Sequence, residues 1–332
     1  MPRPLAIILL ITLALFGSAT ILYAQTPGLG ESEARWRRMA PMPTARSEMP
    51  AAVLQGVIYV PGGLGAFGRA LTVFEAFDPG SNSWRTLESL PQPLHHTGAA
   101  ATGGRIYVAG GYTDSFFRLD NSRAWSYEPA QDEWERIADM PAPRAAHALV
   151  ALDGLIYAVG GVGPRSDELW AFDPDANVWT SDLAPLPTPR EHLTAAVSGG
   201  QIYAIGGRTS GGNLATVEVY DPSEDRWTLR PKMPTARSGL SGATVAGLIH
   251  VAGGEELQGG GTFETHEILD PKTGEWSAGV PLSEPRHGLA TAAVGGSWYV
   301  IGGATRAGAQ TVASLTDAVD ALEAEQGERQ SE

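Results

Sequence analysis

The stretch that decides the fold is residues 189–227, PREHLTAAVSGGQIYAIGGRTSGGNLATVEVYDPSEDRW. It contains an arginine, two short apolar runs, a glycine pair, a loop, the alternating segment VEVYDP and a tryptophan. These parts recur in the same order, and a period of 46 to 50 residues indicates six copies of one supersecondary unit. The pairs that mark the period are Gly62 and Gly63, Gly110 and Gly111, Gly160 and Gly161, Gly206 and Gly207, Gly253 and Gly254, and Gly302 and Gly303.

Two intervals within the unit are constant and one varies. The arginine position precedes the first glycine of the pair by 16 residues, and the acidic corner precedes the tryptophan by six. The interval between the glycine pair and the corner ranges from 13 to 18 residues. Constant spacing is typical of packed strands and variable spacing of loops. We expect the recurring tryptophans to pack between neighbouring units: Trp84, Trp134, Trp179, Trp227 and Trp276.

Each constant interval has the pattern of β-strands. The residues after the arginine are small and apolar, as in a tightly packed inner strand. QIYAI follows a Gly-Gly turn and completes a hairpin with that strand. VEVYDP alternates with period two and ends at a proline, and the tryptophan lies on a fourth strand. Four antiparallel strands per unit and six units predict an all-β, six-bladed β-propeller.

A known repeat family has the same motifs. An Ile-Tyr run that ends in a glycine pair, followed by Tyr-Asp-Pro and a spaced tryptophan, resembles the kelch repeat. The resemblance covers residues 35–315. It implies a kelch β-propeller with four-stranded blades around a central channel.

The two ends of the repeat region are complementary. Trp36 lies ten residues before Arg46, the usual spacing for a fourth strand, yet no first three strands precede it. The last unit has a glycine pair and the segment TVASL (residues 311–315) but no tryptophan. We predict that the N-terminal strand around Trp36 closes the last blade and leaves no open sheet edge. The propeller would then span residues 35–316, followed by an acidic flexible tail at 317–332.

Composition excludes several partners and chemistries. The formal net charge of −14 opposes binding to nucleic acid. The chain has no cysteine, which excludes disulfides, thiolate metal sites and cysteine nucleophiles. Residues 1–24 have the pattern of a signal peptide or an N-terminal membrane anchor, and 25–34 that of a linker. We expect an exported protein, periplasmic, extracellular or anchored facing outside, that contacts the membrane only through that segment.

The repeated arginines have two interpretations. They could form a ring at the channel mouth that binds anions, or each could bind carbonyls and carboxylates between blades. Blade two has Leu94 at this position. The arginines are Arg46, Arg144, Arg190, Arg237 and Arg286.

The residues that follow the arginine position break the repeat symmetry and are further candidates. They could converge at the mouth as an acid–base or sugar-binding set, or lie apart on separate strands. They are Glu48, His95, His96, His147, Glu191, His192 and His287, and the variable loops add Arg69, Arg118, Arg165, Arg208 and Glu255. No His-x-x-x-His spacing occurs, so the sequence predicts neither a metal site nor a cofactor.

Two functions fit this pattern. The first is a non-enzymatic module that binds a protein or glycan through the face carrying the variable loops, including residues 112–127 and 255–267, and the connections between blades. The alternative is a cofactor-independent sugar epimerase or mutarotase, because the chain is similar in size and six-bladed plan to the kelch-type N-acetylneuraminate epimerases. A copper radical oxidase like galactose oxidase is excluded, because that family requires a cysteine cross-linked to tyrosine.

Overall fold

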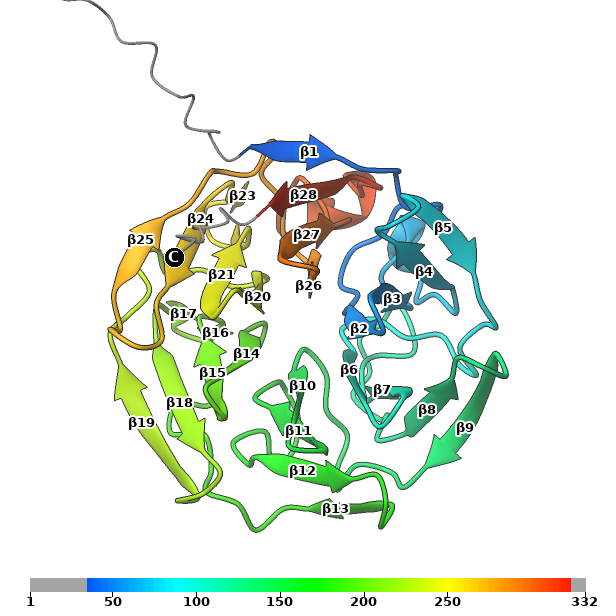
Figure 1. Cartoon of the computed structure of the whole chain (residues 1–332), viewed down its shortest axis with the longest axis vertical. Coiled ribbons are helices and arrows are strands. Elements are labelled where there is room, and N and C mark those ends of the chain that lie inside the picture. Colours follow the sequence, from blue (N-terminus) through cyan, green and yellow to red (C-terminus); the bar gives the residue numbers. More distant parts are fainter. Residues whose placement is uncertain (1–34, 324–332) are drawn as a thin grey trace, which may run out of the picture. The chain divides into compact units, whose positions relative to one another are not determined.

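Six four-stranded antiparallel sheets surround a central channel in the computed structural model, which describes residues 35–323 (Figure 1). The first strand of each blade lines the channel and the fourth lies at the outer edge. Blade one contains β2 (Ala52–Leu54), β3 (Val57–Pro61), β4 (Phe74–Asp78) and β5 (Ser83–Thr86). Blade two contains β6 (Gly98–Thr102), β7 (Arg105–Ala109), β8 (Ala124–Glu128) and β9 (Glu133–Ile137). Blade three contains β10 (Ala148–Leu152), β11 (Leu155–Val159), β12 (Trp170–Asp173) and β13 (Val178–Thr180).

The next two blades follow the same plan and carry additional two-stranded ladders in their loops. Blade four contains β14 (Thr194–Ser198), β15 (Gln201–Ile205), β18 (Val217–Asp221) and β19 (Arg226–Arg230), with the ladder β16 (Arg208–Thr209) and β17 (Gly212–Asn213). Blade five contains β20 (Ser241–Val245), β21 (Leu248–Ala252), β24 (His266–Leu269) and β25 (Trp276–Ala278), with the ladder β22 (Glu255–Glu256) and β23 (Gly261–Thr262).

Both ends of the described chain build the sixth blade. β26 (Ala290–Val294), β27 (Ser297–Ile301) and β28 (Val319–Glu323) come from the C-terminal part, and β1 (Trp36–Arg38) adds the outer strand. Trp36 lies opposite Leu322 in this antiparallel pair (Figure 1). The prediction that the strand around Trp36 closes the last blade is confirmed.

The third strand of the sixth blade differs from the expectation. Residues 311–313 belong to the 3₁₀ helix η2 (Gly308–Ala313), and the strand is formed by β28, inside the segment expected to be a flexible tail. The tail prediction is therefore wrong for residues 319–323. Alternation explains the strand: Val319 and Ala321 are buried in the hydrophobic core, while the intervening Asp320 binds an arginine. Residues 324–332 of the expected tail, the segment 1–24 and the linker 25–34 lie outside the described residues.

The recurring tryptophans join neighbouring blades. The Trp84 indole N–H donates to the Ala40 carbonyl at 3.0 Å, and Trp179 donates in the same way to Ala138 at 2.9 Å. The other four make the equivalent bond to a carbonyl in the connection that comes from the preceding blade: Trp134 to Glu88, Trp227 to Ala184, Trp276 to Pro231 and Trp36 to Val280. Each fourth strand is thus tied to the connection through which the chain passes from the preceding blade into its own blade.

The variable loop after each glycine pair and the connection between blades lie on one face of the propeller. In every blade an isolated β-bridge joins the residue after the arginine position to the first loop residue after the glycine pair, as in Glu191 with Arg208. The glycine pair makes this approach possible, because a Cβ on Gly207 would lie 2.7 Å from the Glu191 carbonyl oxygen. The loop after β3 also contains the 3₁₀ helix η1 (Ala66–Gly68). Among residues 35–323, no helix is long and apolar enough to span a membrane.

Candidate functional site

The repeated arginines are turned into their own blades. Arg190 is 2% exposed; its Nη1 donates to Glu218 on the third strand at 2.5 Å and its Nε to the Gly206 carbonyl at 2.7 Å. Burial lowers the pKa of Arg190, and the Glu218 carboxylate opposes that shift. The equivalent pairs are Arg46 with Glu75, Arg237 with Glu267 and Arg286 with Asp320. These arginines stabilise single blades, rather than bridging blades, and form no ligand ring.

Blades two and three replace the carboxylate of this pair by tryptophan. In blade three the guanidinium of Arg144 stacks on Trp170, 3.3 Å from the ring centroid, and donates to carbonyls including that of Arg165. Burial lowers the pKa of Arg144 to about 9. In blade two Leu94 and Trp125 stand at the arginine and carboxylate positions, so both charges are lost together.

A ring of backbone hydrogen bonds surrounds the channel mouth. The residue two places after the arginine position donates its N–H to the carbonyl of the equivalent residue in the preceding blade, and the sixth bond closes the circle. All six residues have φ between 51° and 63°, the left-handed region. The donors and acceptors are His96 to Glu48, Ala146 to His96, His192 to Ala146, Gly239 to His192, Gly288 to Gly239 and Glu48 to Gly288, at 2.7 to 3.0 Å.

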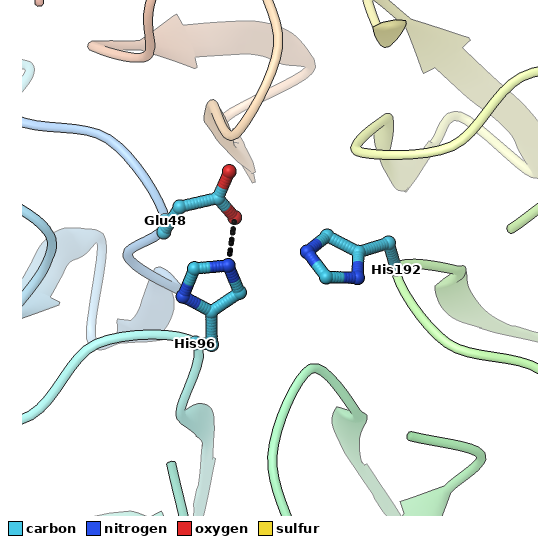
Figure 2. Close-up of side chains that lie close together, drawn as sticks. All are labelled: Glu48, His96 and His192. Carbon is cyan, nitrogen blue, oxygen red and sulfur yellow. Dashed lines mark ion pairs between the residues drawn. The ribbon is translucent and has the colours of Figure 1, made fainter. Parts of the chain in front are cut away.

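Three of the six ring residues carry polar side chains that face one another (Figure 2). His96 Nε2 lies 3.4 Å from Glu48 Oε2, and one ring nitrogen of His192 points toward both residues. The ligand atoms of the three side chains lie within 4.8 Å of one another. The other ring positions are alanine or glycine, so they leave the space between these groups open.

His95 and two aromatic rings support His96. The two Nδ1 atoms of His95 and His96 are 2.6 Å apart, and His95 Nε2 lies 2.9 Å from the Asp114 carbonyl oxygen. The rings of Tyr112 and Phe117 pack against His95, with centroids 5.4 and 4.9 Å away. Burial lowers the pKa of His96 well below its usual range, and the positive charges nearby lower it further.

Arg208 organises the opposite side of the mouth. It donates to Glu191 at 2.9 Å, to Glu255 at 2.7 Å and to His192 Nε2 at 3.2 Å. Burial by itself would raise the pKa of Glu191, but hydrogen bonding and the charges of His192 and Arg208 lower it to about 2. His287 Nδ1 lies 3.5 Å from Glu255 and 3.5 Å from Glu48, so it links the two halves of the cluster.

The structure brings together only part of the expected set. Glu48, His95, His96, Glu191, His192 and His287 converge at the mouth with Arg208 and Glu255 from the loops. His147 is buried between blades, at the position of Leu193 in the next blade, and burial lowers its pKa to about 3. Arg118 and Arg165 form exposed ion pairs with Asp114 and Glu168, and Arg69 lies in the loop that contains η1.

Sequence reasoning missed Tyr112, Asp114 and Phe117. These residues belong to the loop after Gly110 and Gly111, and Tyr112 forms the β-bridge with His95. The repeat itself could have identified Tyr112. In every blade the first residue after the glycine pair forms a β-bridge with the residue that follows the arginine position, and in blade two these residues are Tyr112 and His95.

The channel is narrow and its mouth is acidic. A cavity of about 160 Å³ extends from the backbone ring along the inner strands, below the usual range of about 300–1,000 Å³ for ligand pockets. The mouth holds three carboxylates, Glu48, Glu191 and Glu255, against the single guanidinium of Arg208. This balance of carboxylates over guanidinium favours a cation over an anion.

Comparisons with known proteins agree with the fold. The KLHDC2/KLHL20/DRC7 Kelch-repeats domain model matches residues 31–183, and the Kelch motif model matches residues 189–234. The solved structure of YjhT covers 87% of this chain, and 98% of that chain is covered, with a TM-score of 0.75 and 17% identity.

The curated relatives that match this chain are longer proteins, and the match covers only part of each. Kelch-like protein 35 of Homo sapiens is 39% identical over 211 residues, which cover 63% of this chain and 35% of the relative. Kelch-like protein terF of Aspergillus terreus is 29% identical over 66% of this chain and 41% of its own length, and beta-scruin of Limulus polyphemus 27% identical over 58% and 17%. The match therefore spans less than half of each of these relatives. With six four-stranded blades and two kelch models along its length, this chain belongs to the kelch-repeat β-propellers.

Proposed function

We propose that this propeller is a non-enzymatic binding module whose ligand, a protein or a glycan, docks on the face that carries the variable loops. Exposed apolar side chains in these loops carry the proposal. Phe67 is 86% exposed and Phe116 is 81% exposed, and Leu257 is also exposed in the blade-five loop. Large apolar groups left in water on one face are typical of protein interaction sites, so a protein is the favoured ligand.

The loops that carry these residues support one another. A methyl group added at Gly68 would touch Val312 and Ser115, so the loops of blades one, two and six are neighbours. Thr262 donates to the Thr305 carbonyl at 2.9 Å, and Asn213 donates to the Glu255 carbonyl at 2.7 Å, which extends the contacts to blades five and four. A ligand would therefore meet a connected surface with limited freedom, which reduces the entropy lost on binding.

The test uses paired serine variants of the full chain. Phe67→Ser with Phe116→Ser removes the apolar groups from the loop face, and Val178→Ser with Leu229→Ser removes two exposed apolar groups from the outer strands β13 and β19. Cross-linking and pull-down from the native envelope fraction, followed by affinity measurement on the recovered partner, should show at least about a tenfold loss for the loop-face pair. Equal losses for both pairs, or none for the loop-face pair, would contradict the proposal.

The sugar epimerase or mutarotase is the second candidate. Its support is buried His96 beside Glu48, because a titratable group with a perturbed pKa in a cavity is typical of acid–base sites, and burial lowers the pKa of His96. The acidic mouth and the inward-turned arginines disfavour a sugar carboxylate, however. A glycan array identifies a carbohydrate ligand, and NMR exchange of the sialic acid anomers measures turnover. Accelerated exchange that is lost in His96→Gln would replace the binding module by the enzyme.

We also propose that the protein is exported. The support is the apolar segment at residues 1–24 with small residues at its end. Fractionation of the native host should place the chain outside the cytoplasm, and N-terminal sequencing of the mature protein tells a cleaved signal from a retained anchor. Recovery in the cytoplasmic fraction would contradict export.

A further inference from the structure

We propose that Glu48, His96 and His192 bind one divalent transition-metal ion at the channel mouth, with zinc as the probe. This site goes beyond the proposed docking function, because it uses the backbone ring rather than the exposed loop surface. No local sequence motif indicates this site, because Glu48 and His96 are 48 residues apart and His96 and His192 are 96 residues apart. The three side chains come together only when the blades close around the channel.

The separation of the ligand atoms fits a tetrahedral ion. Metal–ligand distances of about 2.0–2.1 Å place neighbouring ligand atoms of a tetrahedral zinc about 3.3–3.4 Å apart. His96 Nε2 and Glu48 Oε2 are 3.4 Å apart, and the ligand atom of His192 lies within 4.8 Å of both. A small movement of the His192 ring completes the set.

Hydrogen bonding orients His96 as a ligand. The Asp114 carbonyl can only accept, so His95 Nε2 carries the hydrogen and the neutral ring presents a lone pair on Nδ1. His96 Nδ1, 2.6 Å away, must then donate to it, which leaves the lone pair of the neutral His96 on Nε2. That lone pair faces the Glu48 carboxylate. Two acceptors at 3.4 Å repel each other unless a cation lies between them.

His192 has a comparable arrangement. Arg208 donates to His192 Nε2 at 3.2 Å, which requires a lone pair on that nitrogen. His192 Nδ1 lies 3.3 Å from Glu191 Oε2, and a carboxylate beside the second nitrogen is typical of metal-binding histidines. Arg208 keeps its bonds to Glu191 and Glu255 if the metal takes the Nε2 lone pair.

The backbone holds the three ligands in a costly conformation. Glu48, His96 and His192 have φ of 52°, 53° and 51°, where residues other than glycine are strained, and blades five and six have glycine at this ring position. Gly239 and Gly288 leave the remaining side of the mouth open to the cavity, where a water molecule would complete the coordination. Gly288 is needed for this, since a Cβ there would lie 2.5 Å from Glu48 Oε1.

The donor set selects the class of ion. Two imidazole nitrogens and one carboxylate suit zinc and its neighbours in the first transition series, whereas magnesium and calcium require oxygen ligands. The excess of carboxylates over guanidinium at the mouth attracts a divalent cation.

The experiment measures zinc binding by the full chain carrying a tag without histidine. Dialysis against zinc followed by elemental analysis should give one ion per chain. Glu48→Gln, His96→Gln and His192→Gln should each weaken zinc binding by at least about 100-fold, and His95→Gln, which disturbs only the orientation of His96, by about 10–100-fold. Zinc should raise the Tm of the parent protein and not that of the three ligand variants.

His147→Leu is the matched control. This histidine follows His96 by one blade but lies between blades, where the next blade has Leu193, so the variant should bind zinc like the parent. Circular dichroism checks that each variant is folded. In the parent protein, cobalt should give paramagnetically shifted N–H proton signals from two imidazoles. Absence of bound zinc, unchanged binding in all three ligand variants, or cobalt spectra without imidazole signals would overturn the site.

Discussion

At the scale of single residues, a buried charge pair joins the start of the first strand to the third strand in four of the six blades. Arg190 and Glu218 are almost completely buried and form an ion pair, and Arg190 also donates to the carbonyls of Gly206 and Ala204. Desolvation makes such a pair a weak source of net stability, but the loss of one partner leaves an uncompensated charge in the core. Blade two is consistent with this reasoning, because both charges are absent there and tryptophan and leucine take their places.

The corresponding prediction concerns Glu218→Ala. The variant leaves the Arg190 guanidinium buried without its carboxylate, and the free energy of unfolding should fall by about 3–5 kcal/mol in urea denaturation. Glu224→Ala removes an exposed carboxylate paired with Arg226 and should cost at most about 1 kcal/mol. Similar costs for the two variants would contradict the structural role.

Sequence reasoning predicted the members of the mouth cluster better than their roles. Glu48, His96 and His192 stand out because they break the symmetry at one repeat position. The arginines obey the symmetry, and their partners lie 28 to 34 residues later on the third strand: Glu75, Glu218, Glu267 and Asp320. The direction in which each arginine side chain points depends on its acidic partner. The loop between the arginine and that partner varies in length, so the sequence spacing does not reveal the pair.

At the scale of elements, β1 determines whether the sixth blade is complete. The repeat period and Trp36, which has the spacing of a fourth strand but no preceding strands, were sufficient to predict β1. The same reasoning failed for β28, because its segment VDALE lacks the Tyr-Asp-Pro corner and has the acidic composition of a tail. Its burial comes from β27 and β1 on either side, a tertiary effect that no local pattern contains.

Trp36 tests the closure. Its ring packs against Trp298, with centroids 5.5 Å apart, and its N–H bonds to the Val280 carbonyl at 3.1 Å. Trp36→Ala should lower the free energy of unfolding by about 3 kcal/mol, since a large aromatic group is lost. Trp36→Phe keeps most of the packing and should lose about 1 kcal/mol for the hydrogen bond. Equal stability of the alanine variant and the parent would show that β1 is dispensable.

At the scale of the whole molecule, buried histidines should make the propeller sensitive to acid. His250 and His266 lie on neighbouring strands of blade five and pack against Trp298 of blade six. Their Nδ1 and Nε2 atoms are 3.0 Å apart, and burial lowers the pKa of each to about 4. In the unfolded chain both histidines have a pKa near 6.5. Between about pH 6.5 and pH 4 the unfolded chain therefore binds protons at these histidines, whereas the folded chain does not. Stability should therefore fall as the pH is lowered from 6.5 to 4.

Residues from other blades provide the test of this pH dependence. Tyr203 stands at the position of His250 in blade four, and Val217 at that of His266. His250→Tyr combined with His266→Val should remain folded and lose less stability than the parent between pH 7.0 and pH 4.5 in urea denaturation. An identical loss in both proteins would assign the pH dependence to other groups. Carboxylates with lowered pKa, such as Asp132, act only at lower pH.

The circle of peptide hydrogen bonds at the mouth has a consequence for how this surface can diversify. In this circle every blade is bonded to both neighbours through main-chain atoms, so the six hydrogen bonds do not depend on which side chains stand at the six positions. Substitution at Glu48, His96, Ala146 or His192 therefore changes the chemistry of the aperture without removing a hydrogen bond of the circle. These four positions already hold side chains at φ of 51° to 53°, so new functional groups can be placed there on the same backbone, whereas a side chain at Gly288 would displace Glu48.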